Sequence, residues 1–483
     1  MGYPSHGQLK SKRQKLFPSS LIRESDLDYQ LWEGFTLVRQ ANAGDLHAQH
    51  ELGLRYFIGR GFFADTAKAF DWVKKASDRG LPIAQYNLGL FYMNGWGTVW
   101  NPFAAYRQLL LASAQGMPEA DFVVALTLTE NLVVPRNPAK AYRLMKRAAD
   151  AEFEPAQEAL TEFRKKGYDR IAVDSTTPQR RDTTDFLRRQ KDPREYIFLN
   201  FGIDSSSVST DDFIIEAETV VRDTASLKRI LNVSRAGDPW SMIERAAAFG
   251  SPEARVLLGR CYELGTSCPK DPIRAAAHYL SALRLDYPRA YELLQDLVQN
   301  REFARLLEVR AKAEDPAALY VWSGLVALRI DIRLTEQQAL GLLTQSATKN
   351  FPDALIELGV NAASGRWMPQ DRQKAMRYWT RAAEAGNEES EVRIVVSRLF
   401  DQEPEKRQNE LQFLQMAVNE GSILAHLTIA YCHEQGIGVP QNRPLAVRLY
   451  RSIARRGSEA AYGALRRMHD EIRPDAAEFR IAE

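Results

Sequence analysis

Residues 84–116 read AQYNLGLFYMNGWGTVWNPFAAYRQLLLASAQG. The apolar residues Leu88, Phe91 and Tyr92 follow the i, i+3, i+4 spacing of one helix face, and the second half of the stretch repeats that spacing. The letters GWG interrupt the chain between the halves, and an Asn-Pro pair then offers a cap with proline in the first helical turn. The stretch predicts a helix, a glycine turn and a second helix.

Segments of the same kind recur along the chain, most of them 36 residues apart. Each opens on a small residue, called its anchor below: Ala48, Ala84, Ala120, Ala156, Ala254, Ala290, Ala318, Ala354, Ser390, Ala425 and Ala461. Four residues before the anchors, nine of the eleven residues are Gly, Asn or Asp, which most readily adopt the left-handed conformation that ends a helix.

Small residues also recur five positions after the anchors, where a missing side chain lets the first helix approach its neighbour closely: Gly53, Gly89, Ala125, Gly259, Gly359 and Ala430. Because a repeat of two helices buries its apolar faces by stacking on the next repeat, the expected fold is all-α. We expect a right-handed α-solenoid of about ten 36-residue helix–turn–helix repeats in two blocks with an irregular insert.

The pattern A-x-x-x-L-G-x-x-Y-x-x-G-x-G, followed by K-A-x-x-W-x-x-x-A-x-x-x-G, resembles the Sel1-like repeat, a relative of the tetratricopeptide repeat. The first unit carries it nearly whole: Ala48, Leu52, Gly53, Tyr56, Gly59, Gly61, Lys68, Ala69, Trp72, Ala76 and Gly80. Good copies also start at Ala84, Ala254, Ala354 and Ala425, whereas those from Ala120, Ala290, Ala318 and Ser390 lack the double-glycine turn. The resemblance covers residues 40–166 and 241–470.

Five regions are expected from this pattern and from composition. They are a basic N-terminal tail (1–30), a first repeat block (31–166), an irregular insert (167–240), a second repeat block (241–470) and a C-terminal tail (471–483). Residues 196–201 have strand-like composition, and a docking helix is expected at about 211–231. Two interpretations of the insert stay open: a flexible connection with one docking helix, or a segment that folds on the solenoid, occupies its groove or recruits a partner.

Composition narrows the classes of function. Lys and Arg total 64 against 62 for Asp and Glu, so the net charge of +2 gives no electrostatic reason to expect nucleic acid as a partner. Three cysteines cannot form a disulfide framework, no run is long enough for a membrane helix, and the N-terminus lacks a secretory apolar core. We therefore expect a cytoplasmic protein without membrane insertion.

No sequence motif for a nucleotide, a catalytic serine or a zinc-binding helix occurs. His47 and His50 lie three apart on one helix face but have no further ligands obviously placed beside them, so no metal, cofactor or small-molecule substrate is expected. Cys261 and Cys432 share one repeat position, which indicates packing rather than a nucleophile.

We expect such a surface to bind other proteins. In protein interfaces, a few Trp, Tyr and Arg residues contribute most of the binding energy. Trp96 lies between two turn glycines and Trp367 replaces the second glycine of its unit, so we expect them to bind a partner, with Trp100 and Arg60 beside them. The competing interpretation is that each ring packs over the neighbouring turn. Trp72 and Trp379, at the ordinary second-helix position, are expected in the core.

The resemblance implies a non-enzymatic scaffold or adaptor that holds one or more proteins on a concave surface, in a bacterial cytoplasm. One alternative is a translocated effector or virulence factor that binds host proteins. A hydrolase of β-lactamase type, which the resemblance also brings to mind, has no supporting serine or metal set in the sequence.

Overall fold

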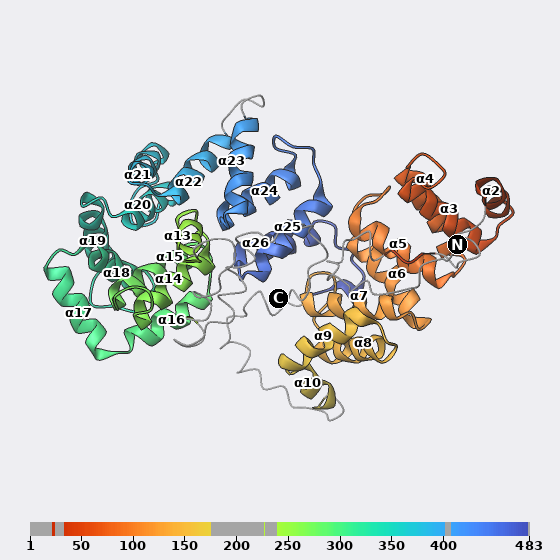
Figure 1. The fold of residues 1–483 in the computed structure, drawn as a ribbon, viewed down its shortest axis with the longest axis horizontal. Helices are drawn as coiled ribbons and strands as arrows, with labels where there is room; N and C mark the ends of the chain where they lie inside the picture. Colours follow the sequence, from red (N-terminus) through yellow and green to blue (C-terminus); the bar gives the residue numbers. More distant parts are fainter. Residues whose placement is uncertain (1–21, 25–32, 175–226, 228–238, 401–406, 482–483) are drawn as a thin grey trace, which may run out of the picture. The chain divides into compact units, whose positions relative to one another are not determined.

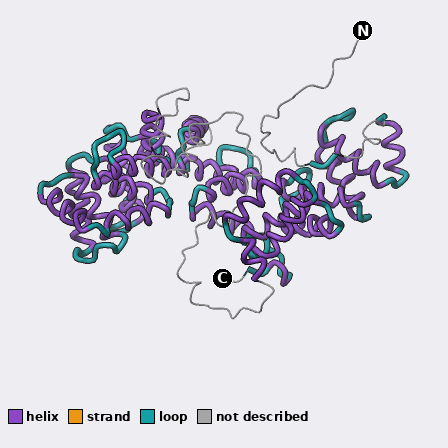
Figure 2. The backbone as a smooth tube through the Cα atoms, turned by 60° about the horizontal axis from the view of Figure 1, so that its bottom comes forward, coloured by secondary structure: helices purple, strands orange, loops and turns teal. Residues whose placement is uncertain are grey.

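The computed structural model describes residues 22–24, 33–174, 227, 239–400 and 407–481. All regular structure in these ranges is helical, and short loops join consecutive helices (Figure 2). The strand-like segment 196–201 and the expected docking helix lie outside the described residues, apart from Leu227, which is buried against Ile243 and Leu257.

The chain divides into two compact units. Unit 1 comprises Met1–Lys191, Glu195–Asp204 and Ala464–Glu483, and unit 2 comprises Asp192–Arg194 and Ser205–Gly463. The helices of unit 1 (Figure 1) are α2 (Gly34–Asn42), α3 (Leu46–Ile58), α4 (Thr66–Asp78), α5 (Pro82–Asn94), α6 (Pro102–Ala114), α7 (Pro118–Glu130), α8 (Pro138–Asp150), α9 (Glu154–Lys165), α10 (Tyr168–Asp174) and the short 3-10 turn Ala477–Phe479.

The helices of unit 2 (Figure 1) are α13 (Pro239–Ala248), α14 (Pro252–Leu264), α15 (Pro272–Arg284), α16 (Arg289–Val298), α17 (Arg301–Lys312), α18 (Pro316–Ala327), α19 (Glu336–Thr348), α20 (Pro352–Ser364), α21 (Arg372–Glu384), α22 (Glu388–Leu399), α23 (Arg407–Asn419), α24 (Ile423–Gln435) and α25 (Arg443–Arg455). The division between the units falls within α26 (Glu459–Asp470). The all-helical fold of paired repeats is the α-solenoid that the periodicity predicts.

The anchors and the residues before them behave as the sequence predicts. All eleven anchors have no exposed surface. All eleven residues four positions earlier have positive φ, including Glu152 at 62° and Glu314 at 56°, whose type did not predict it. The left-handed residue therefore belongs to the repeat geometry, and side chains that tolerate it poorly are accepted there.

The small residues five positions after the anchors allow the two helices of one repeat to touch. A Cβ atom added to Gly259 would lie 2.4 Å from the Tyr279 ring, and one added to Gly359 would lie 2.2 Å from the Trp379 ring. Trp379 is 7% exposed, so its predicted core position is confirmed. The same prediction is wrong for Trp72 on α4, which is only half-buried and has Lys75 Nζ 3.9 Å from its ring centre. Leucine or any larger residue at these glycines would force the paired helices apart.

Neighbouring repeats are joined by arginines at the end of a second helix or just after it. Each donates to a main-chain carbonyl of the preceding repeat, 34 or 35 residues earlier: Arg79 to Gly44, Arg147 to Ser113, Arg381 to Ala347 and Arg456 to Gly421. These bonds add a side-chain donor to carbonyl groups in the last turn of a helix or just after it.

Within unit 2, residues after α25 contact the first repeat of the same unit. The guanidinium of Arg456, after α25, donates to both carboxylate oxygens of Glu253 on α14, at 2.9 and 2.8 Å, and both side chains are buried. Ser458 Oγ also donates to Asp286 Oδ2 at 2.6 Å. The first and last repeats of this unit are thus held together by residues about 200 positions apart.

The C-terminal segment packs within unit 1. Phe479 is fully buried and its ring centroid lies 5.0 Å from that of Phe103 on α6. Arg473 donates to the carbonyl of Leu132 at 2.7 Å and to that of Val133 at 3.1 Å. The segment that the sequence assigns to a tail therefore packs on α6 and on the turn after α7.

Candidate functional site

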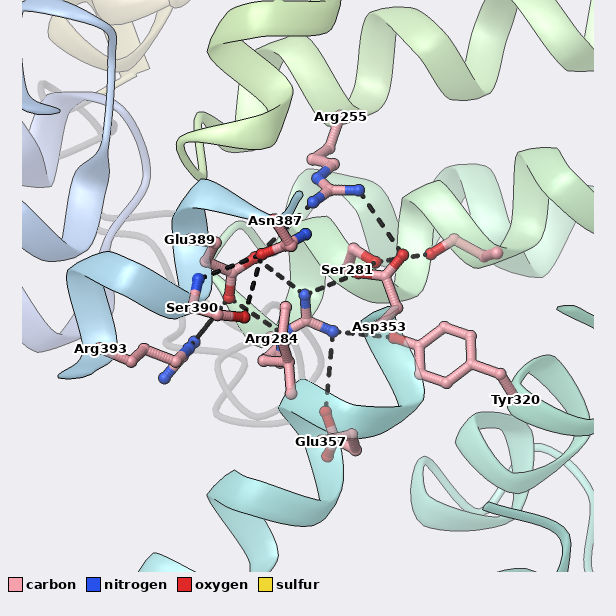
Figure 3. Close-up of polar contacts among 12 residues, drawn as sticks. Arg255, Ser281, Arg284, Tyr320, Asp353, Glu357, Asn387, Glu389, Ser390 and Arg393 are labelled. Atoms are coloured by element: carbon pink, nitrogen blue, oxygen red, sulfur yellow. Dashed lines mark hydrogen bonds and ion pairs between the residues drawn. The ribbon is translucent and has the colours of Figure 1, made fainter. Parts of the chain in front are cut away.

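A buried cluster of charges lies in unit 2, where side chains from α14, α15, α18, α20 and α22 meet (Figure 3). Arg284 is at its centre. One of its terminal nitrogens donates to Asp353 Oδ1 and to Glu389 Oε2, both at 2.9 Å, and the other donates to Tyr320 Oη at 3.0 Å. Arg393 donates to Glu389 Oε1 at 2.9 Å.

The two carboxylates stay ionised because arginines surround them. Burial by itself raises the pKa of Glu389, but Arg284, Arg393 and Arg255 outweigh it and hold the pKa at about 2. Burial is likewise opposed at Asp353, whose pKa lies well below its ordinary value. A general acid working near neutral pH needs the opposite shift, so the cluster is arranged to hold helices together rather than to transfer protons.

A cavity of about 240 Å³ opens beside this cluster. Arg284, Tyr320 and Glu357 reach its wall from the polar side. The remaining lining is mostly apolar and comes from α15, α18, α19, α20 and the turn after α20: Leu280, Leu283, Ser323, Gly324, Ala327, Leu328, Leu343, Val360, Arg366 and Trp367. Its size and lining suit one bulky apolar group with a polar end.

Trp367 occupies this cavity's edge with an unusual backbone. Its φ is 59°, in the left-handed region that the glycine of the repeat pattern normally supplies. The guanidinium carbon of Arg366 lies 5.0 Å from the centre of the Trp367 ring, and the indole is half-buried. Ser267 has a φ of 61° at the equivalent position of its own repeat, so this turn holds L-residues in a conformation that costs them on the order of 1–2 kcal/mol.

The other predicted binding residues lie in unit 1, so the structure does not gather the set at one cavity. Trp96 packs on Phe57 and Phe91, with ring centroids 4.7 and 5.7 Å away, as the competing interpretation expects of a ring that seals the stack. Trp100 is 5% exposed, and its ring meets that of His469 edge-on at 5.2 Å. Arg60 lies exposed in the turn after α3. Their role in binding a partner stays a prediction.

Sequence reasoning missed the charge cluster, although a signal for it exists. Arg255, Asp353 and Glu389 are each the immediate neighbour of an anchor, and the anchors are fully buried. A charged residue beside a buried anchor in successive repeats must find an opposite charge within the stack.

The buried thiols are not poised for chemistry. Burial raises the pKa of Cys261 to about 12 and that of Cys432 to about 11, so both carry their proton at neutral pH. All three cysteines are free of disulfides. In the part of the chain that the structure describes, no group of three His, Cys, Asp or Glu residues is arranged to hold a metal ion.

Comparison with known proteins identifies the repeat. The Sel1 repeat family matches residues 46–81, 82–117, 129–153, 252–287, 352–387 and 424–458. The chain contains six Sel1 repeats. Five of the six matches coincide with helix pairs described above, and the match at 129–153 covers the end of α7 and all of α8. Sel1-repeat proteins are in general protein-interaction scaffolds rather than enzymes.

Two curated relatives share part of these repeats. An uncharacterized protein of Neisseria meningitidis serogroup B is 28% identical over 149 residues, 30% of this chain and 32% of that protein. The rat protein DAP3-binding cell death enhancer 1 is 30% identical over 103 residues, 21% of this chain and 20% of that protein. The chain thus spans about a third and a fifth of the lengths of the curated relatives it matches.

Two crystal structures are also similar. One is a protective antigen present in uropathogenic Escherichia coli strains displaying an SLR fold; it is 18% identical, covers 91% of both chains and has a TM-score of 0.30. The other is a Sel1 repeat protein from Oxalobacter formigenes, 28% identical, covering 26% of this chain and 96% of that chain, with a TM-score of 0.26.

No helix in the described part of the chain combines the length and the apolar character that a bilayer crossing requires.

Proposed function

We propose that this Sel1-repeat chain is a non-enzymatic scaffold or adaptor of the bacterial cytoplasm, and that it takes a bulky apolar side chain of a partner protein into the cavity beside Trp367. The observation that carries the proposal is the pairing of that cavity with an indole kept at a φ of 59°. The indole stands at the rim of that cavity and is half-buried, so a partner side chain in the cavity would contact it.

The surroundings of the cavity favour a protein side chain over a reactive substrate. Arg284 already donates to Asp353, Glu389 and Tyr320, so it gives the wall a fixed charge distribution rather than a free cation. Trp and Arg, the residue types that dominate interface energies, stand together at the rim as Trp367 and Arg366. Both features serve recognition.

The test is affinity purification of the tagged full chain from its native cells, followed by mass spectrometry and by titration of the purified partner. Two variants act on the cavity: Trp367→Ala removes the rim, and Ala327→Phe fills the lining without a change of charge. We expect each to weaken binding at least tenfold, since central aromatic anchors are typically worth about 2 kcal/mol or more.

The matched control is Phe63→Ala, which removes a turn aromatic that is 98% exposed in unit 1. It is expected to leave the affinity unchanged. Retention of the same partner by both cavity variants would contradict the proposed contact, and recovery of no stoichiometric partner by the wild type would contradict the scaffold function itself.

A further inference from the structure

The described residues Ile22–Glu24 lie against the first three repeats of unit 1. The amide side chain of Asn87, on α5, binds both polar atoms of the Arg23 main chain: Oδ1 accepts from the Arg23 N–H at 3.0 Å, and Nδ2 donates to the Arg23 carbonyl at 2.8 Å. Such a two-way contact recognises a peptide main chain whatever its side chains.

The repeats fix Asn87 in the orientation that this contact needs. Asn87 Nδ2 lies 2.8 Å from His50 Nε2 on α3, and both residues are fully buried. Burial, and to a smaller extent His47, lowers the pKa of His50 to about 3, so its ring is neutral and Nε2 can accept the amide proton. The oxygen of the amide is then left to face the main chain of the segment.

A buried amide oxygen without a donor is unfavourable by about 1–3 kcal/mol. The Arg23 N–H supplies that donor, so a polypeptide main chain lying on His50 and Asn87 satisfies the amide in full. This is the feature that separates the site from an ordinary polar surface of a helix.

The side chains of the segment find matching surroundings. Ile22 packs against two apolar clusters, one that includes Leu88 and one that includes Tyr86, both residues of α5. The guanidinium of Arg23 lies 3.6 Å from the carboxylate of Glu119 on α7. The surface on α3, α5 and α7 therefore selects an aliphatic residue followed by a basic one.

We propose that this surface is a binding site for an extended segment of a partner protein with an aliphatic–arginine pair, and that Ile22–Glu24 occupies it as an internal competitor in the free chain. The proposal rests on the protein-binding function above but concerns a different surface. Because this segment belongs to the same chain as its site, it competes intramolecularly and a partner must displace it.

The test uses a fluorescent peptide with the sequence of residues 18–27, PSSLIRESDL, added to the full chain. In the variant Arg23→Pro the tethered segment has lost the N–H that Asn87 binds. We expect the peptide to bind this variant at least tenfold more tightly than the wild type, as measured by fluorescence anisotropy, because the competitor in the same chain is disabled.

Two further arms keep the outcome interpretable. A peptide methylated on the main-chain nitrogen of its arginine is expected to bind the Arg23→Pro chain at least tenfold more weakly, and this arm does not alter the folded protein. Adding Asn87→Ala to Arg23→Pro is expected to abolish binding, with circular dichroism confirming the fold. Glu119→Gln is expected to weaken binding about threefold, an effect that salt suppresses.

Equal affinity of the peptide for wild type and Arg23→Pro, equal affinity of the methylated peptide, or no binding to either chain would each overturn the proposal. None of these results bears on the Trp367 cavity, so the proposed function fails or stands on the partner titration alone.

Discussion

Each unit contains a buried polar cluster, and the two clusters find their hydrogen-bond partners in different ways. In unit 1, the neutral pair His50 and Asn87 meets the main chain of Arg23. In unit 2, Arg284 is held among the carboxylates of Asp353 and Glu389 from other repeats. The His50–Asn87 pair offers hydrogen bonds to a polypeptide segment, whereas the charges around Arg284 satisfy one another.

At the turns, it is unit 2 rather than unit 1 that leaves a side chain beside open space. The turn tryptophan of unit 1, Trp96, is packed against Phe57 and Phe91, whereas that of unit 2, Trp367, stands at the edge of a cavity. The same repeat can thus offer a binding surface on its helices or at its turns. Which one it offers depends on a few residues beside the anchors and in the glycine turn.

The largest effect is expected from breaking the charge cluster of unit 2. Glu389→Gln leaves buried arginines without their anion, and loss of one partner from a buried ion pair typically costs about 3–5 kcal/mol of unfolding free energy. Calorimetry should show a lower melting temperature, and hydrogen exchange should speed up in α15 and α22. Glu391→Gln, at an exposed position on the same helix, is the control and is expected to stay within about 0.5 kcal/mol of wild type.

The low pKa of Glu389 also predicts that the protein loses stability in acid. Because the folded-state pKa of Glu389 is about 2, below its ordinary 4.5, its contribution is present above pH 4.5 and is lost as the pH falls towards 2. If Glu389→Gln and Glu391→Gln have the same melting temperature at pH 7, the cluster does not hold unit 2 together.

The fold was predictable from local chemistry, and the sites were predictable only in part. Anchors such as Ala84 can be recognised in the sequence because a small residue and a left-handed residue must recur at a fixed spacing. The partners of Arg284 come from three other helices, up to 105 residues away, and spacing within one repeat carries no information about them. Likewise, Asn87 looks like one polar residue on an apolar helix until Arg23 is placed beside it.

The surroundings of the tryptophans were likewise not predictable from the spacing within one repeat. Trp96 and Trp367 occupy neighbouring positions of the glycine turn, so the sequence treats them alike. What separates them is the adjoining repeat: Phe57 fills the space beside Trp96, whereas Trp367 adjoins a cavity. Burial of Trp100 depends on His469, which lies hundreds of residues later in the chain.

Truncating the two turn tryptophans should therefore have unequal effects on stability. Trp96→Ala removes a ring packed on two aromatic neighbours and is expected to cost about 2–3 kcal/mol. Trp367→Ala removes a half-buried rim and is expected to cost less than about 1 kcal/mol. Urea denaturation of the two full-length variants, followed by circular dichroism, measures the difference; equal losses would mean that Trp367 is also a packing residue.

The histidine of unit 1 predicts a pH dependence. His50 in the unfolded chain takes up a proton near pH 6.5, whereas in the folded chain burial lowers its pKa to about 3. The unfolded state therefore binds more protons between these values, and unfolding becomes easier as the pH falls, by about 2 kcal/mol from pH 6.5 to 5.

His50→Gln is expected to flatten that dependence in hydrogen exchange of α3 and α5, corrected for the intrinsic effect of pH on exchange. His47→Gln is the control on the same helix and should keep most of the slope, because burial rather than His47 is the main cause of the lowered pKa of His50. An unchanged slope in His50→Gln would show that this ring does not set the acid sensitivity of unit 1.

The smallest expected effect is the difference in stability between glycine and alanine at the two turn positions, 96 and 367. At position 367, where φ is 59°, glycine should be more stable than alanine by about 1 kcal/mol, because an L-residue is strained there. Trp96 is not among the described residues with positive φ, so at position 96 glycine should be less stable than alanine by about 0.5–1 kcal/mol. The four variants can be compared by urea denaturation at one pH, and the two glycine–alanine differences should have opposite signs. Equal signs would mean that the turn relaxes once the indole of Trp367 is gone, and that the ring itself imposes the left-handed backbone rather than the repeat.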